Sequence, residues 1–283
     1  MPRGSRHWSS AQDYVYPEHL RPCLEGLPAT PGVYIFHGAE SEGLPLYIGK
    51  STNIRQRVMS HFRTANESRM LQQARRVTYI ETGGEIGALL LEARMIKQQQ
   101  PLFNQRLRQT RQLCSLHLQG GLAEVVYARD MDFAHQPGLF GLFSSRTAAL
   151  VALRELADSN RLCYGKVGLE KLALGRKCFR ASIQQCAGAC YGAESMAEHH
   201  ARFHDALNEL SVSCWPFSGA VGLVESHAEL SQIHVVRNWC YLASVSNMKD
   251  AQQQAKVEPG FDIDGYKIIR RAIMNSTIKI INL

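Results

Sequence analysis

The sequence predicts an α+β fold: a small central antiparallel sheet flanked by helices, followed by a cysteine-rich region and a small C-terminal α+β element. Two observations predict it. Short β-type runs from residue 32 to 49 are followed by amphipathic helical stretches, and four of the eight cysteines then fall between residues 163 and 190. A chain of 283 residues is long enough for two or three compact domains.

A hairpin opens the first module. The runs GVYIF (32–36) and LPLYIG (44–49) are separated by the polar loop HGAESEG, as in two paired strands. Side chains alternate along a strand, so Tyr34 and Phe36 lie on one face of the first strand, and Tyr47 and Gly49 on one face of the second. We therefore expect the two tyrosines to share a face, although the loop leaves the register open.

A helix follows the hairpin. Ser51 or Thr52 can cap it. Its apolar stripe recurs at every fourth residue, at Ile54, Val58 and Phe62. Arg57 and His61 lie one turn apart on another face, where we expect both to be free to reach a substrate.

The run VTYIET (77–82) predicts a third strand, and a helix is predicted from Glu85 to Gln100, where Pro101 ends it. A helical wheel gives the apolar stripe of this helix as Ile86, Leu89, Leu90, Ala93 and Ile96. Glu92 falls at the edge of the stripe. A carboxylate placed there is partly desolvated.

After residue 108 the pattern restarts. Strands are expected at LCSLHL, EVVYA and GLFGLF, and helices near 147–158 and 196–210. The apolar runs AVGLV, IHVV and WCYLASV and a closing helix near Asp264 predict an α+β tail without recognisable chemistry. We divide the chain into a lead-in (1–26), a first module (27–108), a linker with the cysteine-rich region (109–195) and a C-terminal region of unknown role (196–283).

Positive charge is concentrated in the first module. The formal net charge is +7 and the pI about 9.0, but between Gly43 and Arg76 seven cations face the single acid Glu67, a balance of 7 − 1 = +6. Such a run is expected of a phosphate-binding surface. The candidate contacts to nucleic acid are Lys50, Arg55, Arg63, Arg75 and Arg76.

The first residues, MPRGSRHWSS, carry charge with no apolar run behind them, which argues against a secretory signal. No stretch reaches the roughly 18 apolar residues that a membrane span needs. We expect a cytoplasmic protein with no membrane contact, and the sequence does not predict its oligomeric state.

The first module carries groups suited to phosphodiester hydrolysis, which needs an activated water and charge stabilisation at phosphorus. Tyr34 and Tyr47 could orient or deprotonate water, with Lys50 as the cation that lowers the pKa of Tyr47. Arg57 could bind the phosphate, and Glu92 could hold Mg²⁺. Each of these residues taken alone is more often a packing or surface residue, so the argument depends on their order and spacing.

The spacing resembles the GIY-YIG nuclease family, with Gly32-Val33-Tyr34 as its first triplet and Tyr47-Ile48-Gly49 as its second. The segments PGVY, LYIGKSTNIRQRV, LLLEARMIKQ and PLFNQRL are similar to UvrC, the incision subunit of bacterial nucleotide excision repair. The resemblance implies a DNA endonuclease whose divalent cation is Mg²⁺ or Mn²⁺.

Carried over by position, the resemblance makes Glu92 the metal ligand, Arg57 the phosphate-binding arginine, and Tyr34 and Tyr47 the residues that handle water. Lys50 matches an active-site lysine, and Asn104 a structural or site-lining asparagine. His61 stands where UvrC usually has a further tyrosine. Histidine titrates near 6.5 and could itself be the general base, so the choice among Tyr34, Tyr47 and His61 stays open.

The cysteines Cys163, Cys178, Cys186 and Cys190 have the spacing C-x14-C-x7-C-x3-C within a basic stretch. The spacing favours a metal site and leaves Zn²⁺ and iron–sulfur open. The region also resembles the one in UvrC that holds a 4Fe–4S cluster, which implies iron–sulfur here, although the first interval looks longer. The other four cysteines are scattered and are expected to be structural.

UvrC continues into a UvrB-binding segment, an RNase H-type nuclease and helix-hairpin-helix motifs, for which a chain ending at Leu283 has no room. The resemblance is therefore to a short homologue of UvrC and implies one incision on the 3′ side of a lesion in damaged double-stranded DNA. Recruitment would be through UvrB on DNA, loaded by UvrA. The alternatives are a sequence-specific nuclease and a redox-sensing DNA-binding protein.

Overall fold

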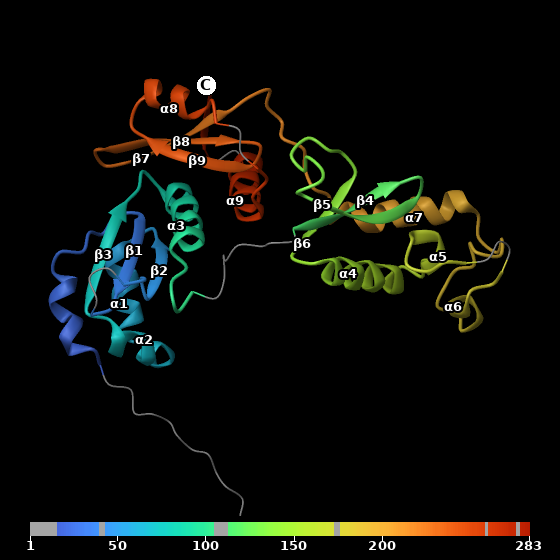
Figure 1. The fold of residues 1–283 in the computed structure, drawn as a ribbon, viewed down its shortest axis with the longest axis horizontal. Coiled ribbons are helices and arrows are strands. Elements are labelled where there is room, and N and C mark those ends of the chain that lie inside the picture. The colour runs from blue at the N-terminus through green and yellow to red at the C-terminus, as the bar shows by residue number, and fades with distance from the viewer. Residues whose placement is uncertain (1–15, 40–42, 105–112, 173–175, 258–259, 276–277) are drawn as a thin grey trace, which may run out of the picture. The chain divides into compact units, whose positions relative to one another are not determined.

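The computed structural model describes residues 16–39, 43–104, 113–172, 176–257, 260–275 and 278–283 (Figure 1). The chain divides into two compact units. Unit 1 comprises residues 1–108 and 224–233, and unit 2 comprises residues 109–223 and 234–283. Most of the expected lead-in and the expected boundary at residue 108 lie outside the described residues, and the domain limits stay a prediction.

Unit 1 is built on a three-stranded antiparallel sheet. Its strands are β1 (Gly32–His37), β2 (Tyr47–Ser51) and β3 (Arg76–Glu81), in the order β2-β1-β3. The register pairs Tyr34 with Gly49 and Phe36 with Tyr47. Paired residues point to the same side of a sheet, so the two tyrosines share a face, as the alternation predicted.

One face of this sheet packs against helix α1 (Ile54–His61), the short helix α2 (Ser68–Gln73) and the 3-10 helix η1 (Glu18–Leu24), and the 3-10 helix η2 (Ala65–Glu67) directly precedes α2. The core here contains Leu20, Tyr34, Phe36, Ile54, Val58, Phe62, Met70 and Leu71, which includes the predicted apolar stripe of α1. The expected cap at Ser51 or Thr52 was wrong. Asn53 caps α1, because its side chain accepts a hydrogen bond from the Gln56 N–H at 2.9 Å.

The other face of the sheet packs against helix α3 (Glu85–Gln99) through Val33, Ile35, Ile48, Met95 and Ile96. The helix ends before Pro101 as predicted, at Gln100 in the left-handed conformation. The predicted stripe was partly wrong, since Ile86 and Leu89 are only half-buried. Gly87, Ala88 and Met95 are buried instead, because the sheet contacts the helix on a face rotated from the one expected.

The backbone N–H groups at the start of α3 are hydrogen-bonded by side chains that lie 138 to 149 residues later in the sequence. The Glu225 carboxylate accepts hydrogen bonds from the N–H groups of Ile86 (3.1 Å) and Gly87 (2.7 Å), and the Gln232 side chain accepts one from Gly83 (2.8 Å). Gly84 at the N-cap position has no side chain to do this. A carboxylate at a helix N-terminus also meets the positive end of the helix dipole.

Unit 2 contains a second antiparallel sheet, in the order β5-β4-β6. It is formed by β4 (Cys114–Gln119), β5 (Leu122–Tyr127) and β6 (Leu139–Phe143), and it packs with α4 (Arg146–Ser159) and α7 (Met196–Asn208) around Leu116, Phe140, Leu153, Phe203 and Leu207. These strands and helices were predicted. The four-residue helices α5 (Tyr164–Val167) and α6 (Phe179–Ser182) were not.

The C-terminal region forms a four-stranded sheet in the order β10-β7-β8-β9. Its strands are β7 (Val221–His227), β8 (Leu230–Arg237), β9 (Cys240–Val245) and β10 (Lys279–Asn282). The predicted closing helix is α9 (Ile263–Met274), capped by Asp262, whereas α8 (Met248–Gln254) and β10 were not expected. Among the described helices, none has the length and apolar character to cross a membrane.

Candidate active site and cysteine cluster

Tyr34 and Tyr47 lie together on the α1 side of the first sheet. Tyr34 is 1% exposed and Tyr47 is half-buried, with their ring centroids 6.2 Å apart. Gly49, opposite Tyr34, makes this packing possible, because a Cβ atom there would lie 2.3 Å from the Tyr34 hydroxyl oxygen. The second triplet therefore needs glycine at this position to admit the phenol.

His61 connects Tyr34 to an acid that the sequence analysis missed. Its Nε2 lies 2.6 Å from the Tyr34 hydroxyl, and its Nδ1 is hydrogen-bonded to the Glu67 carboxylate. An ionised carboxylate only accepts, so Nδ1–H donates to Glu67. In a neutral imidazole, Nε2 then accepts the Tyr34 O–H. The three side chains form a continuous hydrogen-bonded chain.

The expectation that His61 is free to reach a substrate was wrong, since its side chain is buried at 2% exposure. The face of α1 that carries His61 packs onto the sheet, where the ring lies 5.5 Å from Phe36 and 5.4 Å from Tyr47. Any proton that reaches His61 from solvent must therefore pass through a neighbour such as Tyr34.

Burial keeps both phenols neutral. It strongly raises the pKa of Tyr34, with a further increase from Tyr47, while the Arg57 guanidinium acts in the opposite direction. Burial also raises the pKa of Tyr47, Glu92 adds to the increase, and Arg57 and a hydrogen bond with Tyr34 oppose it. Neither tyrosine is a phenolate at neutral pH, so neither is a strong base by itself.

Lys50 does not act on Tyr47 as expected. The two residues are three apart on β2 and point to opposite faces, and the Lys50 ammonium lies 2.7 Å from Glu85 Oε1 on α3. The cation that opposes the raised pKa of Tyr47 is Arg57, on an exposed part of α1. Arg57 is thus next to both tyrosines and open to solvent.

Glu92 reaches the same edge of the sheet from α3. Its Oε1 accepts a hydrogen bond from the Lys50 N–H at 3.0 Å. Burial raises the pKa of the carboxyl, while the Lys50 N–H, the Lys50 ammonium and Arg57 oppose the increase. A divalent cation would offset this desolvation. One such carboxylate suits Mg²⁺, which takes few protein ligands and keeps most of its waters.

Asn104 is buried, and its amide pairs with the backbone of β2. Its Oδ1 accepts the Ile48 N–H and its Nδ2 donates to the Ile48 carbonyl, both at 2.9 Å. The side chain thereby replaces a neighbouring strand at the edge of the sheet. This contact positions the second triplet.

The predicted nucleic-acid contacts Arg55, Arg63, Arg75 and Arg76 are all exposed, and Lys50 is half-buried. Arg75 donates to the carbonyls of Gln72 (2.6 Å) and Ala74 (2.8 Å) and is the most constrained of them. A cavity of about 270 Å³ opens beside the catalytic candidates and is lined by Tyr47, Asn66, Glu67, Arg69, Met70 and Phe103. It adjoins the half-buried tyrosine rather than His61.

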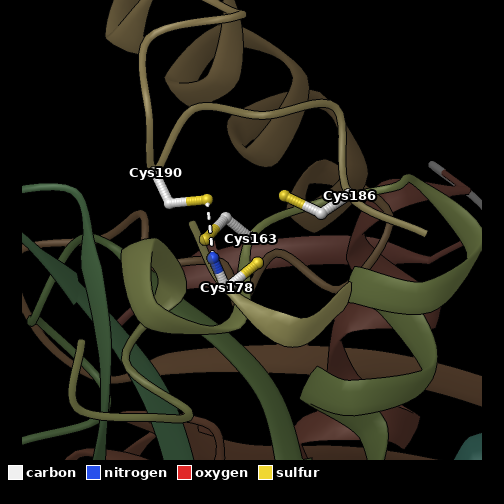
Figure 2. Close-up of side chains that lie close together, drawn as sticks. All are labelled: Cys163, Cys178, Cys186 and Cys190. Carbon is white, nitrogen blue, oxygen red and sulfur yellow. Dashed lines mark hydrogen bonds between the residues drawn. The ribbon is translucent and has the colours of Figure 1, made fainter. Parts of the chain in front are cut away.

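The four predicted cysteines come together in unit 2 (Figure 2). All are buried, and their Sγ atoms lie within 4.8 Å of one another. Cys178 Sγ accepts from the Ala181 N–H (3.3 Å), Cys186 Sγ from Gly188 (3.4 Å) and Cys190 Sγ from Cys178 (3.4 Å). Backbone donors of this kind stabilise thiolates, so the geometry suits a tetrathiolate metal site.

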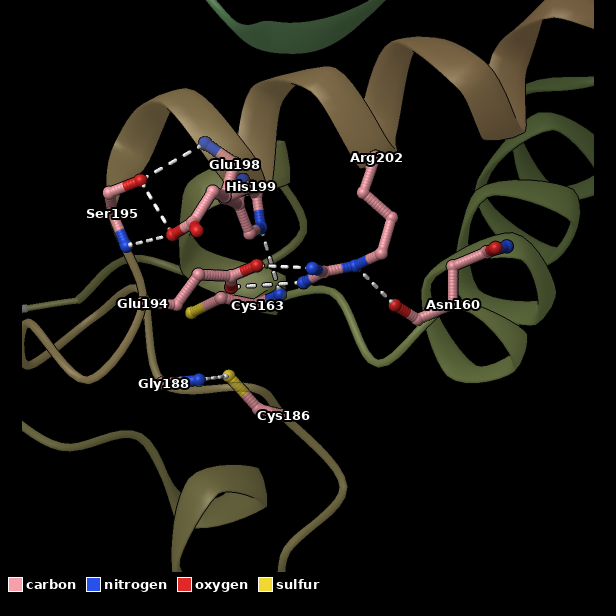
Figure 3. A network of polar contacts seen from close by, with 9 residues as sticks. All are labelled: Asn160, Cys163, Cys186, Gly188, Glu194, Ser195, Glu198, His199 and Arg202. Carbon is pink, nitrogen blue, oxygen red and sulfur yellow. Dashed lines mark hydrogen bonds and ion pairs between the residues drawn. The ribbon is translucent and has the colours of Figure 1, made fainter.

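A polar network fastens the cluster to α7 (Figure 3). The buried His199 accepts a hydrogen bond from the Cys163 N–H at 3.1 Å. Arg202 donates to the Asn160 carbonyl at 2.9 Å and pairs with the Glu194 carboxylate at 2.9 Å. The segment before α5 and the start of α7 are therefore held together beside the thiols.

The thiols differ in acidity. Burial raises the pKa of Cys163 and of Cys186. For Cys190, burial acts in the same direction, but hydrogen bonds from Cys178 and the neighbouring thiols outweigh it and lower the pKa. Metal binding would have to displace protons from Cys163 and Cys186, which makes the affinity depend on pH.

Sequence reasoning missed Glu67, Glu85 and His199. Glu67 carried a usable signal, because it is the one acid among seven cations between Gly43 and Arg76 and follows His61 by six residues. His199 had no comparable signal, since its partner is a backbone N–H 36 residues away.

Three protein-family models match the chain. Residues 30–105 match the UvrC-like GIY-YIG domain, residues 103–209 the UvrC/Cho excinuclease middle domain, and residues 220–283 the excinuclease Cho C-terminal domain. Excinuclease Cho of Escherichia coli K12 is 53% identical over 98% of this chain and 93% of its own length. The Salmonella typhi protein of that name is 54% identical, with 98% and 94% covered.

More distant matches cover the first part of the chain. UvrABC system protein C of Citrifermentans bemidjiense is 32% identical over 65% of this chain and 30% of its own length. Among solved structures, the GIY-YIG N-terminal endonuclease domain of UvrC from Thermotoga maritima, bound to magnesium, is 34% identical. It covers 31% of this chain and 97% of that one, with a TM-score of 0.28.

Proposed function

Because this chain belongs to the excinuclease Cho family, we propose that it makes a single metal-dependent incision on the 3′ side of a lesion in UvrA- and UvrB-processed DNA. The chain is an endonuclease of the GIY-YIG type and a nucleotide excision repair nuclease. The observation that carries the proposed chemistry is the series of hydrogen bonds from Tyr34 through His61 to Glu67, with Arg57 and Glu92 beside it. A role on DNA supports the proposal that the protein acts in the cytoplasm.

The proton path runs inward from Tyr47. As the half-buried tyrosine beside the cavity, Tyr47 would contact the attacking water, and its ring centroid lies 6.2 Å from that of Tyr34. The water proton passes to Tyr47, the Tyr47 proton to Tyr34, and the Tyr34 proton to His61 Nε2. The Glu67 carboxylate holds Nδ1–H and stabilises the imidazolium that forms. His61 is then the base, with two neutral phenols as conductors.

Charge on the phosphoryl group is stabilised by Arg57 and the Glu92 site. Arg57 donates to the non-bridging oxygens from its exposed position beside both tyrosines. Glu92 would hold Mg²⁺ or Mn²⁺, which when bound supplies Lewis-acid stabilisation of phosphoryl oxygens. Lys50 holds Glu92 in place through its N–H, and its ammonium could contact DNA once Glu85 releases it. Asn104 keeps β2 in position.

From the resemblance of this region to the one that holds a 4Fe–4S cluster in UvrC, we propose that Cys163, Cys178, Cys186 and Cys190 hold a 4Fe–4S cluster, with Zn²⁺ as the alternative that the sulfur spacing favours. A single zinc with Zn–S bonds of about 2.3 Å sets its sulfurs about 3.8 Å apart, which the observed limit of 4.8 Å accommodates. A four-iron cluster binds each cysteine to a different iron and needs wider spacing, so the loops would have to open. The absorbance near 400 nm and the iron and zinc content of anaerobically purified protein decide between the two.

The incision assay tests the function. Full-length protein is incubated with lesion-bearing duplex, UvrA, UvrB, ATP and Mg²⁺, and a single nick 3′ of the lesion is expected. The matched control is Glu92→Gln, which should leave no nick. Equal cutting of undamaged duplex without UvrA and UvrB would overturn the repair function, and cutting at one fixed undamaged sequence would indicate a sequence-specific nuclease.

A further inference from the structure

The segment around the cysteine cluster carries basic residues and no acidic ones. From Lys171 to Ala193 the sequence contains four cations and no aspartate or glutamate. Arg180 has partners within the protein, since it pairs with Asp158 at 2.7 Å and its guanidinium lies 4.2 Å from the Tyr164 ring centroid. Arg176 and Lys177 are exposed. The surface beside the thiols therefore presents positive charge that no acid of the same segment neutralises.

Large apolar side chains are exposed on the same segment. Phe179 is 76% exposed, more than any other large hydrophobic side chain that the structure describes. Ile183 is 46% and Tyr191 45% exposed, and the Lys177 ammonium lies 5.1 Å from the Tyr191 ring centroid. Exposed aromatic rings next to cations offer both a stacking face and positive charge to a partner.

The cysteines fix where these rings stand. Phe179 follows Cys178, and Tyr191 follows Cys190. Since the Sγ atoms of the four cysteines lie within 4.8 Å of one another, both aromatic residues are anchored at the same small cluster. An aromatic side chain with a fixed backbone loses little conformational entropy when it binds a flat partner. We call Arg176, Lys177, Phe179, Ile183 and Tyr191 the cluster surface.

We propose that the cluster surface binds DNA, with Phe179 against an unpaired or unstacked nucleobase and Arg176 and Lys177 against the neighbouring phosphates. Aromatic rings stack on bases, apolar wedges enter base steps, and cations meet phosphates. An apolar protein partner would explain the rings but not the absence of acids. The inference rests on the proposal that DNA is the substrate, and it adds a second contact far from Glu92 in sequence.

DNA affinity of the full chain tests the proposal. Fluorescence anisotropy is measured in a Glu92→Gln background, with one duplex fully paired and one carrying a short unpaired bubble. Phe179→Ala should weaken binding to the bubble about ten-fold and affect the paired duplex less, whereas Phe179→Tyr keeps the ring and the affinity. Lys177→Ala should weaken both and lower the slope of log affinity against log salt by about one.

The chain offers matched controls in the same unit. Arg129 also lies over a tyrosine, at 5.0 Å from the Tyr127 ring centroid, but it pairs with Asp130 at 3.2 Å. Arg129→Ala should therefore leave DNA affinity unchanged. Val151 is an exposed apolar residue on α4. Val151→Ala should likewise have no effect.

Metal content, measured on every variant, shows that the cysteine cluster is intact. Two results at unchanged metal content would together overturn the inference. Phe179→Ala would bind the bubble as tightly as wild type, and Lys177→Ala would keep the wild-type slope of log affinity against log salt. Phe179→Ala and Lys177→Ala are also made with Glu92 intact, and lost incision in these proteins at unchanged DNA affinity would make the surface a protein-docking site and overturn the inference. Failure of the proposed repair function is separate, because wild-type protein would then bind the bubble yet make no lesion-directed nick.

Discussion

The nuclease centre and the cysteine cluster both bury polar groups, but they are held in different ways. In the centre, the Tyr34, His61 and Glu67 side chains bond to one another, and the Glu92 carboxylate accepts a hydrogen bond from the Lys50 N–H of the paired strand β2. In the cluster, the thiols sit on loops and on the caps of two four-residue helices, and backbone N–H groups contact the sulfurs. The hydrogen bonds of the centre are therefore formed without a bound ion, whereas we expect the four buried thiols to need a bound metal for their stability.

The largest expected effect is on activity. Glu92→Gln should lower the incision rate roughly 10³-fold or more, because it removes the carboxylate at the cation site. DNA affinity should change little, since Glu92 acts mainly in the transition state. Single-turnover incision and anisotropy on the same preparation check both. A parallel loss of binding and turnover would mean that the residue anchors DNA instead.

The same substitution should stabilise the metal-free protein. Burial raises the pKa of Glu92 on folding, so the unfolded chain loses the proton first as pH rises, and stability falls above the unfolded pKa of about 4.5. Wild type should lose stability relative to Glu92→Gln as pH rises above about 4.5, until the folded-state carboxyl has also ionised. Urea denaturation with a magnesium chelator at several pH values measures this difference. Equal pH profiles would show that the carboxyl is well solvated.

Loss of a thiol should affect stability instead of chemistry. Cys186→Ser should remove the proposed metal and lower the unfolding midpoint of unit 2 by about 10 °C, because metal binding contributes folding free energy. Calorimetry with hydrogen exchange locates the change. Cys214→Ser is the matched control, since Cys214 is exposed and outside the cluster. An unchanged midpoint would remove the distinction between the two regions.

An intermediate effect is expected at Glu67. Glu67→Gln should slow incision about 10²-fold, because the side chain no longer offers a carboxylate to His61 Nδ1–H. A purely structural role would lower the unfolding midpoint along with the rate, whereas a role in the chemistry leaves the midpoint unchanged. Glu18→Gln is the control, as Glu18 pairs with Arg21 at the surface and outside the site.

The smallest expected effect is at Asn104. Asn104→Ala should cost about 2 kcal/mol of unfolding free energy, because it leaves the Ile48 N–H and carbonyl buried without a partner. Chemical denaturation measures this loss. Asn66→Ala, at an exposed position, should stay within about 0.5 kcal/mol of wild type. A similar cost at both positions would argue against the role assigned to the Asn104 amide.

Strand alternation and cysteine spacing predicted which side chains lie together. Alternation along β1 and β2 placed Tyr34 and Tyr47 on one face, and the same alternation would have separated Lys50 from Tyr47 had it been applied there. The cysteine spacing predicted their grouping. The catalytic roles of all these residues stay predictions.

Long-range packing could not be predicted in the same way. A helical wheel fixes the angle between Arg57 and His61 but not which of them the sheet covers, so His61 was wrongly expected to be exposed. The partners of α3 and of Cys163 lie far away in the sequence and leave no periodic signal.

The contact of Glu225 with the first turn of α3 has a consequence for protein engineering. A fragment cut at residue 108 would leave the N–H groups of Ile86 and Gly87 without their acceptor, in the helix that carries Glu92. Replacing Gly84 with aspartate could restore a cap, since its backbone is extended and only Glu225 occupies the space that the new side chain needs. An isolated nuclease domain would thus need the Gly84→Asp substitution when it is separated from the segment that carries Glu225.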